Sequence, residues 1–323
     1  MIKKTREKSV RLLTVEAGSR RVRSDHPKYP LIEAELGRLQ AGYRGEQAMD
    51  YYLTFLPDEN YQILHGLRLE DHKSRCFQMD TVLLSPSHCL LLDSKNVTGE
   101  LEFDEKCHQL KRKTLDGYEA LGDPISQVER QKHQLEKWME NHIGKSIPII
   151  AQVVLTNKNA TLLGSTTSLM KKVTFLTNLP NRMTTIHGNF PNSILDGKEL
   201  RKLVRTLIKK HIPDNFALFD YYNIPVSEFK NGVICPDCMH FPMKRKKGHW
   251  LCIDCGCKSR TAHVETLKDY LLLIGNTITN KKARNLLLIP SKSSTLRILQ
   301  ALDLPCKGQG KNSVYFLDGI MKL

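Results

Sequence analysis

The chain has 323 residues, an apolar fraction of 40% and a formal net charge of +15 at pH 7. This length is enough for two or three domains that need no disulfides. The sequence contains no run of 18 or more apolar residues, so no membrane span is predicted. The basic N-terminus lacks the apolar stretch of a secretory signal, and four of the nine cysteines form paired C-x-x-C motifs. We therefore expect a cytoplasmic protein whose cysteines bind metal rather than form a disulfide framework. The positive charge predicts a nucleic acid partner, most simply DNA, although a basic surface that only aids solubility remains an alternative.

The first 30 residues contain nine Lys or Arg, three acids and few large apolar side chains after Val15. This composition predicts a partly disordered basic arm along phosphates, or a frayed terminus with incidental charge. Between Pro30 and Pro57 apolar residues recur at helical spacing. Because Gly42 and Gly45 interrupt this pattern, it predicts two helices or one bent helix.

A predicted hairpin follows the first predicted strand, Tyr61–Leu69. Two short apolar runs, 81–84 and 89–92, are joined by a Ser-Pro-Ser turn, with Asp80 before the first run and Asp93 and Lys95 after the second. Two neighbouring carboxylates repel each other and persist together when a cation lies between them. A lysine two residues after the second acid points to the same face, where it can stabilise charge on a phosphate or orient a water.

The remaining elements of this region alternate between strands and helices. Asp123 and Pro124 are typical of a helix start, and the helix pattern runs as far as Asn141. Further strands are predicted at 100–103, 109–113, 147–155 and 173–176, with a closing helix at 197–210, and the two strands at 100–113 are expected to extend the sheet. The order predicts an α/β sandwich, with a mixed sheet flanked by helices.

The spacing of an acid, a short apolar run and acid-x-Lys resembles the core of the PD-(D/E)xK nucleases. Four segments of this chain carry a narrower resemblance: Gly42-Tyr43-Arg44-Gly45-Glu46, Gln78-Met79-Asp80, Asp93-Ser94-Lys95-Asn96-Val97-Thr98-Gly99 and Asp123-Pro124-Ile125-Ser126-Gln127. In this order they resemble the NERD (nuclease-related) domain over roughly residues 35 to 160. The family usually has Glu where this chain has Asp93, whose carboxylate reaches one methylene less far.

The resemblance implies a PD-(D/E)xK-like fold and metal-dependent hydrolysis of DNA. Asp80, Asp93 and the backbone carbonyl of Ser94 would hold Mg²⁺ or Mn²⁺, which lowers the pKa of a bound water. Lys95 would stabilise charge or position the water, and Glu46 and Gln127 would complete the site. The alternatives are a solvated glutamate at a helix start for Glu46 and an exposed polar helix residue for Gln127.

A second motif lies at residues 235–257. Cys235, Cys238, Cys252 and Cys255 form C-x2-C-x13-C-x2-C, which resembles a zinc ribbon with a structural, tetrahedral Zn²⁺ site. His249 and Cys257 are possible substitutes for one ligand. The intervening Lys244, Arg245, Lys246 and Lys247 predict a basic ribbon tip that contacts phosphates, or one that only solubilises the protein.

Three predicted helices, 263–274, 279–287 and 291–302, precede a predicted strand at 313–317. This order resembles a helix-turn-helix with a small wing, in which the second helix of the pair would present Lys292, Ser293 and Arg297 to DNA. The alternative is a three-helix packing module that does not bind DNA.

The sequence therefore predicts a basic arm at 1–30, a NERD-like domain at 31–215, a zinc ribbon at 230–260 and a helix-turn-helix-like domain at 261–323. The leading function is that of a metal-dependent DNase. One alternative is a catalytically inactive nuclease-fold protein that binds DNA or has a regulatory role. The presence of Asp93 in place of the usual Glu favours this alternative. An RNA-processing or RNA-binding factor is another, because phosphate attraction alone does not separate DNA from RNA.

Overall fold

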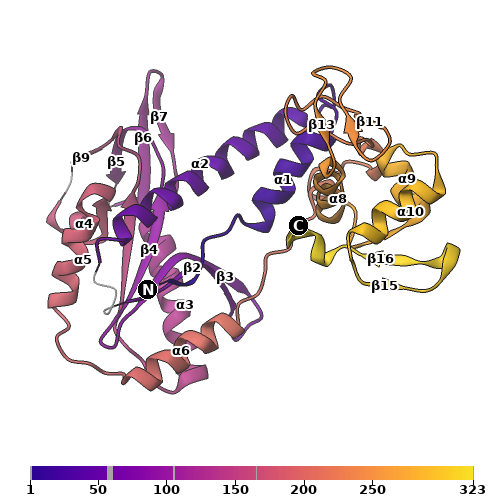
Figure 1. The fold of residues 1–323 in the computed structure, drawn as a ribbon. Helices are drawn as coiled ribbons and strands as arrows, with labels where there is room; N and C mark the ends of the chain where they lie inside the picture. The colour runs from indigo at the N-terminus through magenta and orange to yellow at the C-terminus, as the bar shows by residue number, and fades with distance from the viewer. Residues whose placement is uncertain (1, 57–60, 105, 165, 323) are drawn as a thin grey trace. The chain divides into compact units, whose positions relative to one another are not determined.

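The computed structural model describes residues 2–56, 61–104, 106–164 and 166–322. The chain divides into two compact units, each described by itself below. The first unit holds residues 1–9 and 38–214, and the second unit holds residues 10–37 and 215–323 (Figure 1). Among the described helices, none combines the length and the apolar character that a bilayer crossing requires.

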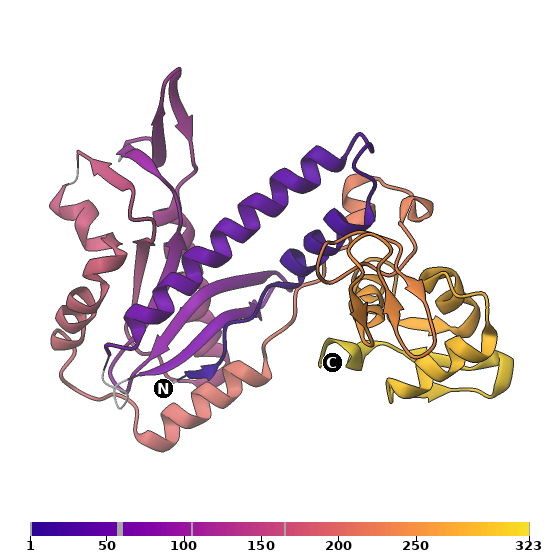
Figure 2. The same cartoon turned by 45° about the horizontal axis from the view of Figure 1, so that its top comes forward.

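The first unit is built on a six-stranded mixed sheet in the order β1-β2-β3-β4-β8-β10. Its strands are β1 (Ile2–Lys4), β2 (Gln62–Glu70), β3 (Cys76–Leu84), β4 (Cys89–Lys95), β8 (Ile149–Leu155) and β10 (Val173–Phe175). The strands β2, β3 and β4 pair antiparallel, whereas β1 runs parallel to β2, and β8 runs parallel to both β4 and β10. Figure 2 shows the long, curved strands β2 and β3 in purple. The expected α/β architecture, a mixed sheet flanked by helices, is confirmed.

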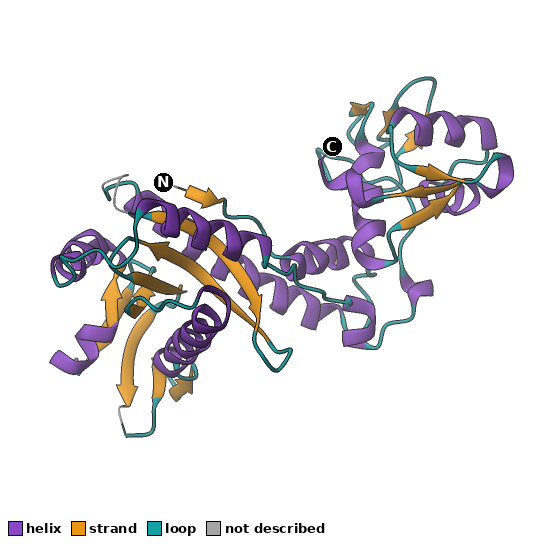
Figure 3. Cartoon of the chain, turned by 90° about the horizontal axis from the view of Figure 1, so that it is seen from below, coloured by secondary structure: helices purple, strands orange, loops and turns teal. Residues whose placement is uncertain are grey.

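Helices cover both faces of this sheet (Figure 3). On one face α3 (Pro124–Ile143) and α6 (Gly197–Lys209) pack against Leu91 and Val153. On the other face α2 (Tyr29–Leu53) and α5 (Leu179–Gly188) pack against Leu90 and Leu92. The short helices α4 (Thr167–Lys172) and η1 (Leu176–Asn178) complete this part of the unit. The alternation of side chains along β4 thus divides the core into two layers.

The strands expected to extend the main sheet belong to a separate sheet instead. Its four strands, in the order β7-β6-β5-β9, are β5 (Gly99–Asp104), β6 (Gln109–Thr114), β7 (Gly117–Ala120) and β9 (Ala160–Leu163). Gly99 has a φ of +92° and starts β5, which pairs with β9 rather than with a strand of the main sheet. The left-handed backbone at this glycine turns the chain out of the main sheet.

Helix α2 is one continuous helix, so of the two expectations for this segment the separate helices are wrong. Gly45 serves close packing instead. A Cβ on Gly45 would lie 2.7 Å from both the Asn96 Cβ and the Thr156 Oγ1, whereas a Cβ on Gly42 would meet nothing within 4 Å. A short helix break and a close contact look alike in sequence, because both favour glycine.

The second unit contains α1 (Val10–Arg21), α7 (Leu218–Tyr222), α8 (Ala262–Leu273), α9 (Asn280–Leu287), α10 (Lys292–Ala301) and the 3₁₀ turns η2 (Val226–Glu228), η3 (Gly310–Asn312) and η4 (Asp318–Lys322). Two small antiparallel sheets accompany them. One consists of β11 (Lys244–Arg245), β12 (Trp250–Leu251) and β13 (Lys258–Ser259), and the other of β14 (Thr277–Thr279), β16 (Val314–Phe316) and β15 (Cys306–Lys307). The three helices expected after residue 262 and the final strand are present.

The partly disordered arm expected over residues 1–30 is wrong, because these residues form β1, α1 and the start of α2. Helix α1 buries Leu12 and Val15 and packs against α8. Its Arg21 is fully buried, with its Nε 2.7 Å from Asp269 Oδ2 and its Nη1 2.7 Å from the Gly232 carbonyl oxygen. A basic composition therefore conceals a helix that is held partly by a buried ion pair.

Candidate active site and metal centre

The predicted acids lie beside an irregularity in the β2–β3 ladder. Gly66, with a φ of +56°, stands opposite Asp80, between the paired residues His65–Thr81 and Leu67–Met79. Met79 and Val82 both pack into the core layer below α3, so the alternation of side chains along β3 shifts between them. This shift redirects the backbone at Asp80, which strict alternation along a strand does not predict.

Asp80 binds the end of the neighbouring strand. Its Oδ2 accepts hydrogen bonds from the Ser94 backbone N–H at 3.0 Å and from the Ser94 hydroxyl at 3.3 Å. Asp80 is half-buried, and Ser94 follows Asp93 directly in β4. The carboxylate of Asp80 is therefore fixed at the carboxyl end of β4.

Asp93, Lys95 and Gln127 form a closed set of contacts. The Lys95 Nζ lies 2.7 Å from Asp93 Oδ2 and donates to Gln127 Oε1 at 3.2 Å, while Gln127 Nε2 donates to Asp93 Oδ1 at 3.1 Å. Asp93 is 1% exposed, whereas a quarter of the Lys95 side chain is exposed. The lysine thus connects a buried carboxylate with the surface.

The start of α3 positions Gln127. Asp123 caps this helix, with its Oδ1 accepting from the backbone N–H groups of Ile125 and Ser126 at 3.0 Å, and Pro124 is the first helical residue. Gln127 lies in the first turn and faces β4. Capping and proline at this position fix where the helix begins, and with it the amide that contacts Asp93.

The close packing of α2 positions Glu46. Asn96, which follows β4, donates from its Nδ2 to the Ala41 carbonyl oxygen at 2.7 Å and accepts from Asn157 Nδ2 at 2.8 Å. Together with the contact at Gly45, this holds the middle of α2 against the ends of β4 and β8. Glu46 is the next residue along the helix.

Glu46 is held by Arg6, a residue that the sequence did not single out. The Arg6 Nη1 lies 2.6 Å from Glu46 Oε2, and its Nη2 lies 2.8 Å from Asp50 Oδ1. The same Nη2 donates to His65 Nδ1 at 2.8 Å and to Thr81 Oγ1 at 3.0 Å. Only 5% of the Arg6 side chain is exposed. A local motif cannot show this arginine, because its partners lie 40 to 75 residues further along the chain.

The acids influence one another electrostatically. Burial, and next the charge of Asp80, raise the pKa of Glu46 to about 7, although Arg6 acts in the opposite direction. Burial and the charge of Asp80 also raise the pKa of Asp93 to about 6, against the effect of Lys95. Two buried carboxyl groups whose ionisation a third acid disfavours are typical of a site that takes up a cation.

Two observations fit a divalent ion at this site: the kind of ligand atoms present, and one buried carboxylate oxygen that lacks an aligned hydrogen bond among the described residues. Asp93 Oδ2 is buried and accepts no aligned hydrogen bond within the described part of the chain, although Lys95 Nζ lies nearby. Carboxylate and carbonyl oxygens suit Mg²⁺ and Mn²⁺. Glu46, Asp80 and Asp93 are not among the described groups of three or more ligand atoms that lie within 4.8 Å of one another. Binding of one ion by all three carboxylates would therefore require them to approach each other.

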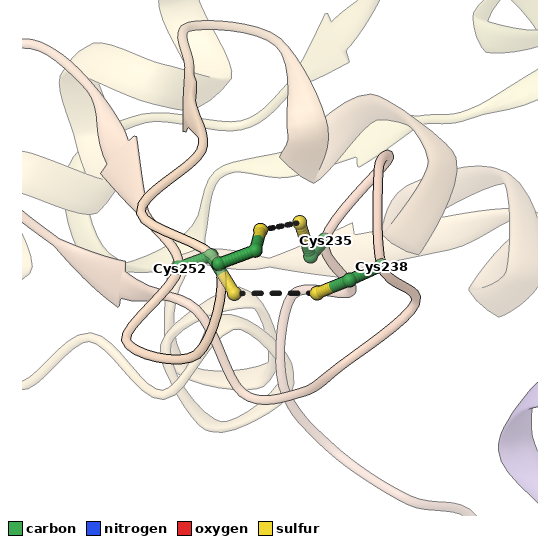
Figure 4. A group of neighbouring side chains, drawn as sticks. Cys235, Cys238 and Cys252 are labelled. Atoms are coloured by element: carbon green, nitrogen blue, oxygen red, sulfur yellow. Dashed lines mark hydrogen bonds between the residues drawn. The ribbon is translucent and has the colours of Figure 1, made fainter.

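The four predicted cysteines form such a group. The sulfur atoms of Cys235, Cys238, Cys252 and Cys255 all lie within 4.8 Å of one another. The Sγ–Sγ distance is 3.6 Å both for Cys235–Cys255 and for Cys238–Cys252 (Figure 4). Four sulfurs around a tetrahedral Zn²⁺ at about 2.3 Å would be about 3.8 Å apart. The arrangement can therefore accept zinc with little movement.

The two possible substitute ligands lie outside this cluster. Neither His249 nor Cys257 belongs to the group of close ligand atoms in the described chain. The His249 ring is placed with its Nδ1 3.0 Å from the Lys247 carbonyl oxygen. The first and second C-x-x-C motifs are therefore sufficient to supply four ligands.

Of the residues predicted to contact nucleic acid in the two C-terminal motifs, only some line a common groove. A groove of about 560 Å³ in the second unit is lined by Lys244, Arg245, Lys246, Lys247, Ser291 and Ser294, with Met243, Pro242 and residues 288–290. Lys292, Ser293 and Arg297 are exposed on α10 but do not line it. The Arg245 guanidinium lies 5.1 Å from the centre of the Trp250 ring and is only partly exposed. The basic strand and the start of α10 therefore border one groove.

The chain matches the nuclease-related domain family (NERD) over residues 41–156. This range includes Glu46, Asp80, Asp93, Lys95 and Gln127, but it leaves out Arg6 and the cysteine cluster. No curated protein and no solved structure matches the chain. The similarity therefore concerns about a third of the protein, the part that holds the acids.

Proposed function

We propose that this protein is a metal-dependent nuclease that hydrolyses phosphodiester bonds in DNA. The observation that supports this most directly is the contact set of Asp93, Lys95 and Gln127, with Asp80 fixed to the adjacent Ser94. It lies within the stretch that matches the nuclease-related family. A buried acid, a second acid and a partly exposed lysine at one strand end suit the binding of a metal ion and a phosphate.

In this proposal Asp80, Asp93 and the Ser94 carbonyl would hold Mg²⁺ or Mn²⁺. When bound, such an ion supplies Lewis acidity and lowers the pKa of a water molecule. Lys95 is placed to donate to a phosphate oxygen or to the attacking water, and Gln127 holds both Lys95 and Asp93 in position. Glu46, whose pKa is raised to about 7, is able to hold or release a proton near neutral pH.

The second unit would supply affinity for the nucleic acid. We assign Zn²⁺ to the four-cysteine cluster in a structural role, since four thiolates leave no coordination position for catalysis. The ribbon at 230–260 and the helix-turn-helix-like segment at 261–323 would act as DNA-binding modules in the reducing cytoplasm. Lys244–Lys247 on the groove, with Lys292, Ser293 and Arg297 on α10, would contact the phosphates.

A catalytically inactive nuclease fold that binds DNA is the second candidate. The observation that favours it is the ion pair between Lys95 and Asp93, in which the lysine neutralises the buried acid without any other cation. In this candidate the acids are structural, and Mn²⁺ does not bind at millimolar concentration in calorimetry. Binding of Mn²⁺ that requires Asp80 and Asp93 would exclude it.

The deciding experiment compares cleavage of supercoiled, linear and single-stranded DNA with and without Mn²⁺. The variant Asp80→Ala with Lys95→Ala is expected to lose metal-dependent cleavage and to keep the fold. Asp104→Ala with Lys111→Ala is the matched control, because it removes an Asp–Lys ion pair of 2.9 Å from the small sheet of the same unit. Cleavage by the purified Asp80→Ala, Lys95→Ala protein at the wild-type rate would refute the proposal. Competition between duplex DNA and RNA at fixed salt tests the choice of DNA.

A further inference from the structure

The first unit contains a pocket that none of the candidate active-site residues lines. Its volume is about 690 Å³, which lies in the range of small-molecule sites. Three elements form its wall: the turn between β2 and β3 (residues 70–75), the C-terminal half of α3 and the end of α6 with residues 210–212. Gln127 and Trp138 stand eleven residues apart on α3, or about 16 Å. The pocket is therefore separate from the acids at the end of β4.

The pocket is strongly basic. Its lining includes five cationic side chains, two carboxylates and four histidines, namely Lys73, Arg75, Lys137, Lys209 and Lys210, Glu70 and Asp71, and His72, His133, His142 and His211. Lys73, Lys137, Lys209 and Lys210 have no carboxylate within ion-pair distance in the described chain. Unpaired ammonium groups around one cavity create a positive potential that attracts anions.

One of the two carboxylates shapes the pocket and does not neutralise its lysines. Asp71 Oδ2 accepts from Arg75 Nε at 2.9 Å and Nη2 at 2.7 Å, and its Oδ1 accepts from the backbone N–H groups of Lys73 and Arg75. The Arg75 guanidinium, first among these partners, holds the pKa of Asp71 well below its ordinary value. The turn at 71–75 is thereby closed on itself, with Lys73 at its exposed tip.

The attraction of cations to helix C-termini explains the presence of only some of the four unpaired lysines. Lys209 and Lys210 stand at the end of α6, where positive charge stabilises the helix dipole without any ligand. Lys73 is in a turn between strands, and Lys137 lies more than one turn before the end of α3. These two lysines come from different elements and have only the cavity in common. Their position therefore supports the binding of an anionic ligand in the cavity.

The pocket also offers flat rings. His142 stacks on Trp138, with ring centroids 4.2 Å apart and an angle of 12° between the planes, and His133 is exposed on the same helix. Phosphate groups are typical partners of several converging lysines, and bases stack on aromatic rings. We propose that this pocket binds the phosphate groups of a nucleotide, either free or within a strand, with the base against the histidine rings.

The test measures binding by calorimetry without divalent ions, so its result does not depend on cleavage. The probes are pyrophosphate, ATP and a 5′-phosphorylated pentathymidylate. The pocket variant is Lys137→Glu with Lys209→Glu. The matched control is Lys132→Glu with Lys202→Glu, which makes the same charge change on the same two helices, at residues that do not line the pocket.

Wild type and control are expected to bind ATP or the pentanucleotide equally, and the pocket variant at least tenfold more weakly. Loss of ATP binding assigns a free nucleotide, and loss confined to the pentanucleotide assigns a strand. Equal weakening in both variants, or no binding of any probe by the wild type, would overturn the pocket. Equal affinity for pyrophosphate and ATP, with the pentanucleotide no tighter, would overturn the role of the base. If charge reversal unfolds the unit, Lys137→Gln with Lys209→Gln takes its place.

Discussion

The guanidinium of Arg6 lies 2.6 Å from the carboxylate of Glu46, although 40 residues separate them in the chain. Arg6 comes from the short segment that precedes α1, and it also binds Asp50, His65 and Thr81. A single nearly buried cation therefore balances two carboxylates beside the candidate active site. Burial, and next the charge of Arg6, lower the pKa of His65 to about 4, so this ring stays neutral and accepts from Arg6.

Replacement of this arginine should be costly. We expect Arg6→Met to reduce the free energy of unfolding of the first unit by about 3 to 5 kcal/mol, because two partly buried carboxylates lose their partner. Each unit has one of the chain's two tryptophans, Trp138 in the first and Trp250 in the second. Urea unfolding followed by Trp138 fluorescence in a Trp250→Phe background measures the loss. The control Arg112→Met breaks a more exposed pair with Glu119 and should change stability by less than about 1 kcal/mol.

The two glycines of α2 should respond in opposite ways to alanine. Gly42→Ala should stabilise the first unit by up to about 1 kcal/mol, since alanine is the better helix former and nothing lies within 4 Å of the new Cβ. Gly45→Ala should destabilise it by about 1 to 3 kcal/mol, because its Cβ would collide with Asn96 and Thr156. Thermal unfolding of both variants is sufficient, and a stabilising Gly45→Ala would contradict the close packing of α2.

Acid should destabilise the first unit through His88. This ring is fully buried, with its Nδ1 near the hydroxyls of Ser85 and Ser87 and its Nε2 3.0 Å from the Tyr61 hydroxyl. Burial, and next the charge of His187, lower the pKa of His88 to about 4. The unfolded chain, with an ordinary histidine pKa, binds the proton more strongly, so this stability is complete above pH 6.5 and is lost as pH falls towards 4.

The expected loss from this histidine is about 1 to 2 kcal/mol between pH 7.5 and pH 5. His88→Gln should therefore flatten the dependence of the unfolding free energy on pH, even if it lowers stability at pH 7.5. His72→Gln changes an exposed histidine and should leave the slope of the wild type. An unchanged slope in His88→Gln would show that other groups dominate acid unfolding.

The buried ion pair of the second unit should contribute strongly to its stability. Asp269 is 1% exposed on its side chain and binds both Arg20 and Arg21, with Arg21 equally buried. Asp269→Ala should cost about 3 to 5 kcal/mol, because it leaves a buried guanidinium without its partner. Glu265→Ala on the same helix removes an exposed pair with Lys268 and should cost less than about 1 kcal/mol. Trp250 fluorescence in a Trp138→Phe background reports the difference.

Metal analysis tests the cysteine cluster. The purified protein should contain one zinc ion per chain, and Cys252→Ser should lose most of it, because three thiolates hold zinc less tightly than four. Cys306→Ser, an exposed cysteine of the same unit, should retain the full content. Loss of zinc should alter the environment of Trp250, which lies two residues from Cys252, and leave Trp138 unchanged. Equal zinc in the two variants would show that the cluster is not the site.

Local sequence patterns predicted the secondary-structure elements of this protein better than they predicted which elements pack or pair with each other. The apolar run at β8, the capped start of α3 and the cysteine spacing depend on neighbouring residues, and each is found close to its expected position. The acids and Lys95 also lie together, because the hairpin that joins them is short. The extra strands β7 and β9 and the helix α5 were missed, since short or mixed segments carry weak periodicity.

The contacts over long sequence distance could not be predicted in the same way. Arg6 and Arg21 were predicted to belong to a basic arm along phosphates or to a frayed terminus, because a single sequence does not show which arginine pairs with a buried acid. The assignment of β5 and β6 to a separate sheet depends on β9, which lies about 60 residues further along. Such pairings are tertiary, and propensity does not encode them.

The pairing of Arg21 with Asp269 also has a consequence for synthesis in the cell. The acid leaves the ribosome 248 residues after the arginine, an interval of about 12 to 50 s at ordinary elongation rates. Throughout that time α1 lacks the complete helix α8, against which it packs, while most of the first unit already has its complete sequence. The earliest helix to be translated is therefore among the last to reach its native place, and a nascent chain halted before residue 269 would leave it open to proteolysis.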